Sequence, residues 1–290
     1  MKHLNGSVAA AGEPAASRHV AEDVDVVRGR VARFLPRLVL VCTVLAAGAA
    51  RTEPLLDDAA ERYRPLMAEE TDRSLAGVRA MREAVLAGDV DAAQKAWIVA
   101  RVGWERAEVF TSGFTELDRE IDAWPNAATG FHAIEAKLFG AGRLDVRPEA
   151  DALIFHLTDL RAKIRDTRLT AQGLLDGAAK LAYEVGESKA DGGESRFSGT
   201  SLDDMRNNVD GLDSVFRIVF ASAVEARDAK LAEAIRGTIG QLQTLLQVPV
   251  LARLDSRTLR AASEELIIAF QTAAPLLGLQ RPSLQDLVQQ

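Results

Sequence analysis

Apolar side chains recur along most of this chain at intervals of three and four residues, with polar side chains between them. This is the period of an amphipathic α-helix, because residues i, i+3, i+4 and i+7 share one helix face. In the stretch 90–110 the apolar face is formed by Ala93, Trp97, Ala100, Trp104 and Ala107. No segment shows the convincing alternation of apolar and polar residues that a half-buried strand would have. The pattern therefore predicts an all-α protein.

Glycine, proline and small polar residues divide the pattern into about eight helices. We expect helices over 54–86, 90–110, 128–139, 148–164, 169–186 and 201–225, and two more between 226 and 277, separated near Pro249. The segments 111–127 and 188–200 read as loops, the first with a short turn. Eight helices are too many for one four-helix bundle, so two packed four-helix bundles are the expected architecture.

The first fifty residues differ from the rest. An apolar run over 38–50 follows Arg33 and Arg37 and ends in small residues, which are the parts of an export signal. The run is short for a membrane span. We expect residues 1–50 to be a leader that acts as an export signal or as an uncleaved signal anchor, and residues 51–290 to form the folded domain. The single cysteine, Cys42, lies in this leader, so the domain has neither a disulfide nor a thiolate metal site.

The chain is acidic, with a formal net charge of −7, and its lysines and arginines form no cluster. Nucleic-acid binding depends on basic patches that neutralise phosphates, so this balance argues against a nucleic acid as partner. It favours a cation.

The strongest candidate for chemistry is the pair His132 and Glu135, three residues apart in a predicted helix. Side chains at i and i+3 lie on one face with Cβ atoms about 5–6 Å apart, close enough to share one cation. Imidazole and carboxylate together suit divalent metals such as iron, zinc or copper. The alternative is a helix with one partly buried histidine and one solvated glutamate.

Other carboxylates could complete such a site. Glu108 falls on the apolar side of its helix and Glu184 lies in a similar apolar setting, and carboxylates are seldom buried unless they are paired or bind metal. For Glu105 we favour a surface ion pair with Arg101 or Arg106. The other histidine of the domain, His156, reads as a packing or surface residue.

Several enzyme classes lack their motifs. The sequence has no H-E-x-x-H, no pair of E-x-x-H motifs, no P-loop and no G-x-G-x-x-G. A serine–histidine–aspartate triad would have to use His132 without a nucleophile-elbow context.

Several segments resemble the imelysin-like family, and within it the EfeO/EfeM periplasmic iron-uptake proteins. Gly130, His132 and Glu135 match the family motif G-x-H-x-x-E, and residues 100–108 resemble its A-R, aromatic, E-x-x-E segment. Further matches are Gly88-Asp89, Leu117-Asp118 with Ile121-Asp122, Gly177-Ala178 with Leu181 and Glu184-Val185, Ser188-Lys189, and Asn208-Val209-Asp210-Gly211. The likeness extends from residue 54 to about 280 and is to the shorter EfeM form, without the cupredoxin domain of EfeO. The loop 192–202 departs from the EfeO pattern, which has a histidine and an aspartate there.

The resemblance implies two four-helix bundles with a metal site in the cleft between them, built from His132, Glu135, Glu108 and Glu184. It implies capture of ferrous or ferric iron as cargo, with zinc or copper as other candidates, and delivery to an iron permease, with a haem-type peroxidase as a further partner. It places the protein in the periplasm or at the extracellular face of the cell envelope, in contact with the membrane only through the leader or the permease. Two alternatives remain: an imelysin-type metallopeptidase, and a polysaccharide- or polyanion-binding protein that uses the same cleft.

Overall fold

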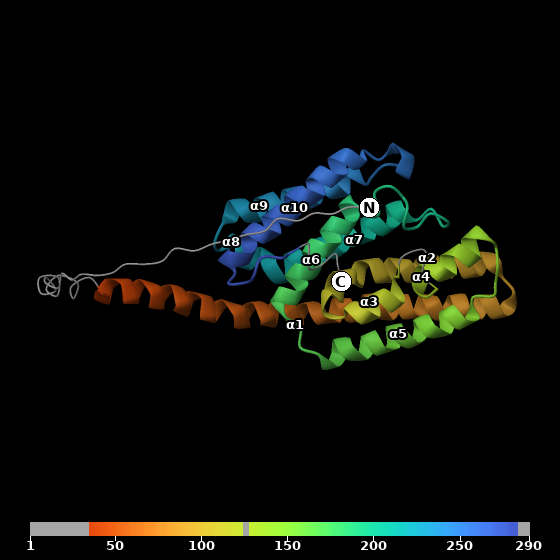
Figure 1. Ribbon diagram of the computed structural model, residues 1–290, viewed down its shortest axis with the longest axis horizontal. Coiled ribbons are helices and arrows are strands. Elements are labelled where there is room, and N and C mark those ends of the chain that lie inside the picture. The colour runs from red at the N-terminus through yellow and green to blue at the C-terminus, as the bar shows by residue number, and fades with distance from the viewer. Residues whose placement is uncertain (1–34, 124–127, 284–290) are drawn as a thin grey trace, which may run out of the picture. The chain divides into compact units, whose positions relative to one another are not determined.

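The computed structural model describes the backbone of residues 35–123 and 128–283, and within these ranges the side chains from residue 56 onward except 111 and 112. The chain divides into two compact units, residues 1–46 and 47–290, and the helices discussed below belong to the second apart from the start of α1. All regular elements of the described residues are helices (Figure 1). The all-α prediction is confirmed.

One group of helices forms the first bundle. It contains α1 (Leu35–Ala87), α2 (Val90–Ala107), α3 (Thr115–Ile121), α4 (Gly130–Glu135) and α5 (Arg147–Asp166). Ion pairs from Arg82 to Asp151 and from Arg161 to Asp72 join α1 to α5. The indole of Trp97 on α2 donates a hydrogen bond to the backbone carbonyl of Phe131 on α4. This bond fixes α4, the helix that carries His132, against α2.

The remaining helices form the second bundle. They are α6 (Ala171–Gly186), α7 (Ser201–Val215), α8 (Ala221–Glu225), α9 (Ala229–Leu245) and α10 (Ser256–Leu276). Helix α10 packs on α6 and α9, and α7 packs on α6 and α9. The two bundles meet where α7 lies against α2 and where α6 lies against the short 3-10 helix η1 (Glu108–Gly113).

Helix α2 approaches α1 very closely, because Gly103 has no side chain. A Cβ atom at this position would lie 2.6 Å from the backbone carbonyl oxygen of Glu70 and 2.6 Å from the backbone nitrogen of Ser74. Any larger residue would therefore push the two helices apart. Since α2 also contacts α7, it is the helix shared by both bundles, and polar groups on it can reach residues from either one.

The helix boundaries follow the predicted ones with several differences, of which the first is that α1 begins at Leu35 and not at residue 54. The loop expected over 111–127 contains a helix, α3, although residues 124–127 lie outside the described part. The helix expected to end at 139 is α-helical only to Glu135 and finishes in a π-helical turn, η2 (Ala136–Gly140). A second π-helical turn, η3 (Phe216–Phe220), interrupts the helix expected over 201–225, and a short 3-10 turn, η4 (Leu251–Arg253), precedes α10. A π-helical turn contains one residue more than an α-helical turn, and such turns frequently occur at functional sites.

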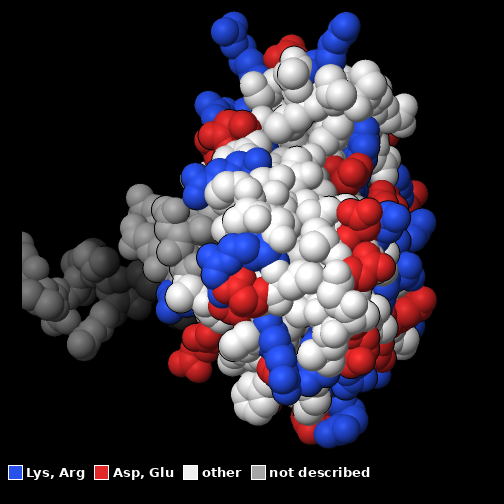
Figure 2. All heavy atoms as spheres, turned by 90° about the vertical axis from the view of Figure 1, so that its right-hand side faces the viewer, with Lys and Arg blue, Asp and Glu red and all other residues white. Residues whose placement is uncertain are grey.

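The leader predicted over residues 1–50 lies outside the residues whose side chains the structure describes. Among those that it does describe, none of the helices combines the length and the apolar character needed to cross a bilayer. On the face shown in Figure 2, basic and acidic side chains are interspersed around uncharged surface.

Candidate metal centre

Helix α2 places a buried arginine at the boundary between the bundles. Arg101 is only 1% exposed, and its guanidinium carbon lies 5.8 Å from the ring centre of Trp97 and 5.2 Å from that of Phe131. The guanidinium pairs with Glu105, one helical turn further along α2, and with Asp122. Burying a charge is costly unless it is paired, and these carboxylates supply the pairing.

The segment between α3 and α4 brings Asp122 beside His132. Gly130 begins α4 at φ = 77°, and a Cβ atom there would lie 2.5 Å from the carbonyl oxygen of Ile121. Only glycine permits both the positive φ and this approach. The result is that Asp122 Oδ1 lies 3.3 Å from His132 Nε2, while Asp122 Oδ2 accepts a hydrogen bond of 2.7 Å from the indole of Trp104.

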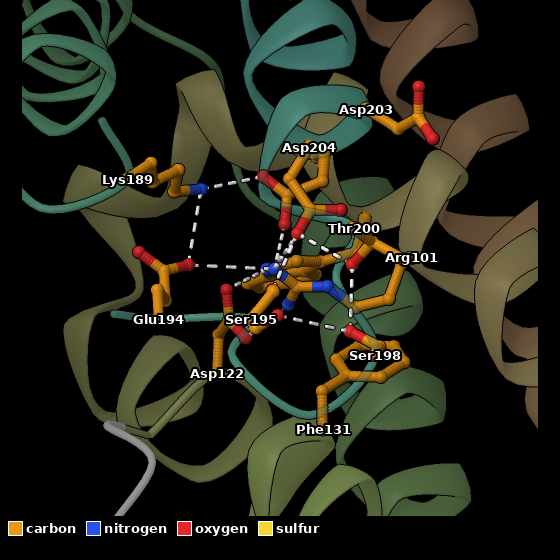
Figure 3. Close-up of polar contacts among 12 residues, drawn as sticks. Arg101, Asp122, Phe131, Lys189, Glu194, Ser195, Ser198, Thr200, Asp203 and Asp204 are labelled. Carbon is orange, nitrogen blue, oxygen red and sulfur yellow. Dashed lines mark hydrogen bonds and ion pairs between the residues drawn. The ribbon is translucent and has the colours of Figure 1, made fainter. Parts of the chain in front are cut away.

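The connection between α6 and α7 contributes the other side of the cluster. Glu194 Oε1 lies 3.6 Å from His132 Nε2, 3.5 Å from the Arg101 guanidinium and 3.5 Å from the ammonium of Lys189. Asp204, on α7, accepts hydrogen bonds from Ser195 (2.6 Å) and Thr200 (3.0 Å). Figure 3 shows Lys189 and Glu194 on one side of the arginine head group, and Ser198 and Thr200 on the other.

Glu135 holds the imidazole ring of His132 in a fixed orientation. Its Oε2 lies 3.0 Å from His132 Nδ1, and its Oε1 accepts hydrogen bonds from the backbone nitrogens of Phe197 (2.9 Å) and Ser198 (2.7 Å) and from the Ser198 hydroxyl (2.8 Å). Both oxygens of Glu135 are therefore engaged. A carboxylate bonded to one ring nitrogen is the usual arrangement for a histidine that binds metal through the other.

The other ring nitrogen, His132 Nε2, is buried and has no hydrogen-bond partner among the described residues. It faces Asp122 and Glu194, and one ligand atom from each of these three side chains lies within 4.8 Å of the others. Two ligands of one metal ion at bond lengths of about 2.1 Å are at most roughly 4.2 Å apart, so only a small contraction would close the site. The three groups form a candidate metal centre.

The cluster contains more carboxyl groups than basic side chains. Two basic side chains, Arg101 and Lys189, and the imidazole of His132 are surrounded by six carboxyl groups. These belong to Glu105, Glu108, Asp122, Glu135, Glu194 and Asp204. An excess of buried carboxylates favours the binding of a cation, because the ion relieves their mutual repulsion.

The pKa values of the buried groups reflect this crowding. Burial raises the pKa of Glu108 to about 8 and that of Glu105 to about 7, in spite of the attraction of Lys189 for both and of Arg101 for Glu105. Burial alone would lower the pKa of His132, but the carboxylates of Glu135, Glu194 and Asp122 outweigh it and raise the value to about 9. Burial likewise disfavours the charged form of Glu194, yet Lys189, His132 and Arg101 hold its pKa far below the ordinary range.

The structure separates the four residues predicted from the sequence. His132 and Glu135 are in direct contact. Glu108 lies in the same cluster, where its Oε2 is 3.1 Å from the Lys189 ammonium. Glu184 instead lies 3.4 Å from the ammonium of Lys180. Its place in a ligand set with His132 remains a prediction.

Two residues of the candidate centre were missed. Asp122 follows a short helix that the sequence pattern did not reveal, although it is part of the Ile121-Asp122 match. Glu194 lies in a glycine-rich loop with no periodicity, where no ligand was expected. The available signal was compositional: each is an acidic residue beside a glycine- or proline-containing turn rather than on a helix face.

The expectation for Glu105 was wrong in one respect. It pairs with Arg101, as one of the two proposed partners, but the pair is buried and not at the surface: Glu105 is 0% exposed. The reason is that α7 covers this face of α2, and Asn208 donates a hydrogen bond of 2.6 Å to Glu105 Oε2. His156 lies away from this cluster, 3.7 Å from Glu120.

Comparisons with known proteins agree with this architecture. The crystal structure of an iron-regulated protein A precursor from Parabacteroides distasonis superimposes with a TM-score of 0.61, covering 78% of this chain and 95% of that one at 14% identity, which shows a shared fold. The iron uptake system component EfeM of Pseudomonas syringae pv. syringae is 30% identical over 224 residues, which are 73% of this chain and 78% of the relative.

Two further relatives extend the comparison. An EfeM/EfeO family lipoprotein of Staphylococcus haemolyticus is 28% identical over 66% of this chain and 70% of its own length. EfeO of Escherichia coli O157:H7, an iron uptake system component, is 31% identical over 64% of this chain, and the match spans about half (53%) of EfeO. The family model described as imelysin (Peptidase_M75) matches residues 59–274, most of the second compact unit. The chain therefore belongs to the imelysin family.

Proposed function

We propose that this protein captures iron as the binding component of an uptake system of the EfeM/EfeO type. The observation that carries the proposal is the buried Nε2 of His132, which has no hydrogen-bond partner among the described residues and faces the carboxylates of Asp122 and Glu194. The relatives named iron uptake components supply the identity of the cation. Iron is the cargo of this site, and zinc and copper are the other ions that an imidazole and two carboxylates would suit.

Each group has a separate task in the proposed site. His132 binds the ion through Nε2, and Asp122 and Glu194 bind it through oxygen. Glu135 fixes the ring through Nδ1 and so acts on the ion through His132, which refines the expectation that it is itself a ligand. Arg101 holds Asp122 and Glu194 near one another in the absence of the ion, because its guanidinium contacts both.

The proposed function includes a location and partners. Residues 1–50 export the protein or anchor it, and residues 51–290 form the imelysin domain in the periplasm or at the outer face of the envelope. The lipoprotein among the relatives supports export. The bound ion is delivered to an iron permease, and a haem-type peroxidase belongs to the same system. Membrane contact is made only through the leader or the permease, and no nucleic acid takes part.

Capture fits the geometry better than peptide hydrolysis does. A metallopeptidase needs a carboxylate with a free oxygen to take a proton from metal-bound water. Both oxygens of Glu135 are engaged, one by His132 and the other by three donors from Phe197 and Ser198. A polyanion would meet an excess of carboxylates in this cluster. We therefore favour a binding protein over an enzyme.

The test compares His132→Ala with His156→Ala, the matched control from the other histidine of the domain. Calorimetry with ferrous iron under anaerobic conditions, and with zinc, should show that His132→Ala weakens binding by more than the roughly 10- to 100-fold that loss of an outer hydrogen-bond partner costs. His156→Ala should bind like the wild type. Equal binding by all three proteins would sink the proposal, and hydrolysis of an unfolded protein that stops with a chelator would favour the peptidase.

A further inference from the structure

A second group of carboxylates adjoins the candidate centre and shares one residue with it. One oxygen each of Glu105, Glu108 and Asp122 lies within 4.8 Å of the others, and Asp122 also belongs to the group around His132. Two cation positions that share a bridging carboxylate are the usual arrangement in sites that bind two metal ions, about 3.5–4 Å apart. The acidic side chains thus form two overlapping groups, each with ligand atoms for one cation.

The second position is already taken by a cation of the protein itself. The ammonium of Lys189 lies 2.6 Å from Glu105 Oε2 and 3.1 Å from Glu108 Oε2, and the lysine side chain is 2% exposed. The same ammonium is 3.5 Å from Glu194, so it touches carboxylates of both groups. A buried ammonium that is bonded to several carboxylates occupies the place, and supplies the charge, of a small bound cation.

Asn208 lies beside this position and carries a buried side-chain oxygen, Oδ1, that has no hydrogen-bond partner among the described residues. Its side chain is fully buried, and Nδ2 donates hydrogen bonds to the Glu105 backbone carbonyl (3.0 Å), Glu105 Oε2 (2.6 Å) and Glu108 Oε2 (3.0 Å). Buried acceptors without a partner are uncommon. While the Lys189 ammonium is in place, the amide nitrogen and not this oxygen faces the carboxylate pair. With a metal ion in place of the ammonium, rotation of the amide by half a turn would turn the oxygen toward the ion.

We propose that Lys189 takes the place of a second metal ion and so limits the centre to one ion of cargo. The inference rests on the proposed function of the His132 centre. Lys189 neutralises Glu105 and Glu108, which would otherwise repel each other, and it does so with a charge that is tethered to the chain and is never released. Removal of the ammonium should therefore leave a vacant cation position lined by Glu105, Glu108, Asp122 and Asn208.

The test counts metal ions in Lys189→Met, which keeps the apolar stem of the side chain and removes the charged ammonium. Lys180→Met is the matched control, because Lys180 is also largely buried and bridges two carboxylates, Asp118 and Glu184, which lie outside both groups. Full-length protein is dialysed to equilibrium against zinc, and in parallel against manganese, and the metal per folded chain is determined by elemental analysis. We expect one ion in the wild type, two in Lys189→Met and one in Lys180→Met.

A second variant keeps the test open if Lys189→Met does not fold without metal. Lys189→Gln retains an uncharged donor for Glu105 and Glu108, and both variants are also prepared with zinc present throughout. One ion in whichever variant folds overturns the inference, and so does the failure of zinc to support folding of either, because a second cation should replace the lost ammonium. A wild type that binds no metal would instead overturn the proposed function, so the two failures are distinguishable.

Discussion

Two lysines of this protein each bridge acidic side chains, and only one of them adjoins the candidate metal centre. Lys189 is 2% exposed and contacts Glu105, Glu108 and Glu194. Lys180 is 17% exposed and contacts Asp118 at 2.7 Å and Glu184 at 3.4 Å. Both lysines have a raised pKa because burial, which disfavours the charged form, is outweighed by these neighbouring carboxylates.

The difference between the two clusters lies in what accompanies the lysine. Lys180 pairs with two carboxylates, those of Asp118 and Glu184, which are partly in contact with solvent. Glu184 Oε2 lacks a hydrogen-bond partner there, but no imidazole of the described residues faces it. Around Lys189 the carboxylates outnumber the cations, and the buried Nε2 of His132 faces two of them without a hydrogen-bond partner among the described residues. We therefore base the candidate site on two features together, the excess of carboxyl groups and a ligand atom without a hydrogen-bond partner, and not on a buried ion pair alone.

The largest expected effect comes from removing the arginine that holds the His132 cluster together. Arg101→Met leaves Glu105 and Asp122 buried without their main counter-charge, and breaking a buried ion pair in this way costs about 3–5 kcal/mol of unfolding free energy. Urea unfolding of the metal-free protein measures it. Lys180→Met should lose clearly less, because water reaches that cluster. Equal losses would remove the distinction between the two regions.

A smaller effect separates the two glutamates that adjoin these lysines. Glu194→Gln removes one of the proposed charged ligands of the His132 centre, and we expect zinc affinity to fall by about 10- to 100-fold, or roughly 1.4–2.8 kcal/mol. Glu184→Gln should change it by less than a factor of about 3, since Glu184 has no contact with His132. Isothermal titration of both variants gives the comparison. The reverse order would restore Glu184 to the ligand set and exclude Glu194.

The pH dependence of stability should also originate in the His132 cluster. Glu105 and Glu108 have pKa values raised from 4.5 to about 7 and about 8, and that of His132 is raised from 6.5 to about 9. All three bind a proton more tightly in the folded state, so the free energy of unfolding should fall as pH rises from 5 to 9. Glu135 and Glu194 have lowered pKa values, and their contribution is lost only below this window.

The corresponding measurement is thermal unfolding of the metal-free protein by circular dichroism between pH 5 and 9. The midpoint should be highest near pH 5, and Glu108→Gln should flatten the curve. Saturating zinc should flatten it as well, because the ion replaces the protons as the source of positive charge. A midpoint that is flat or rises with pH in the metal-free wild type would contradict the assigned shifts.

Most of the fold could be predicted from the sequence, because apolar residues recur in these helices with the period of an α-helix. Helix α2 was predicted from alanines and tryptophans spaced at three and four residues, and its observed bounds differ from 90–110 by only the final turn, which is 3-10. Helix α3 was not predicted, since seven residues provide too few repeats of the pattern. The π-helical turns were also beyond reach, because periodicity within one segment does not reveal a single inserted residue.

The site was predictable only where its residues are neighbours in sequence. His132 and Glu135 lie on one turn of α4, and their contact follows from helix geometry alone. Asp122 and Glu194 reach His132 from a turn and a loop, and their positions depend on how the chain packs. The burial of Glu105 was missed for the same reason, because the sequence of α2 alone does not show that Asn208 of α7 covers Glu105.

The hydrogen bonds from the backbone of Phe197 and Ser198 to Glu135 have a consequence for the dynamics of this region. Amide hydrogens in a connecting segment ordinarily exchange quickly with solvent, but these two end on an oxygen of a buried carboxylate. They can exchange only when the segment lifts away from α4, and that motion would release Glu135 and with it the orientation of His132. The exchange rates of two peptide groups therefore report how often the imidazole is set free, and a cation that holds His132 and Glu194 together should slow both at once.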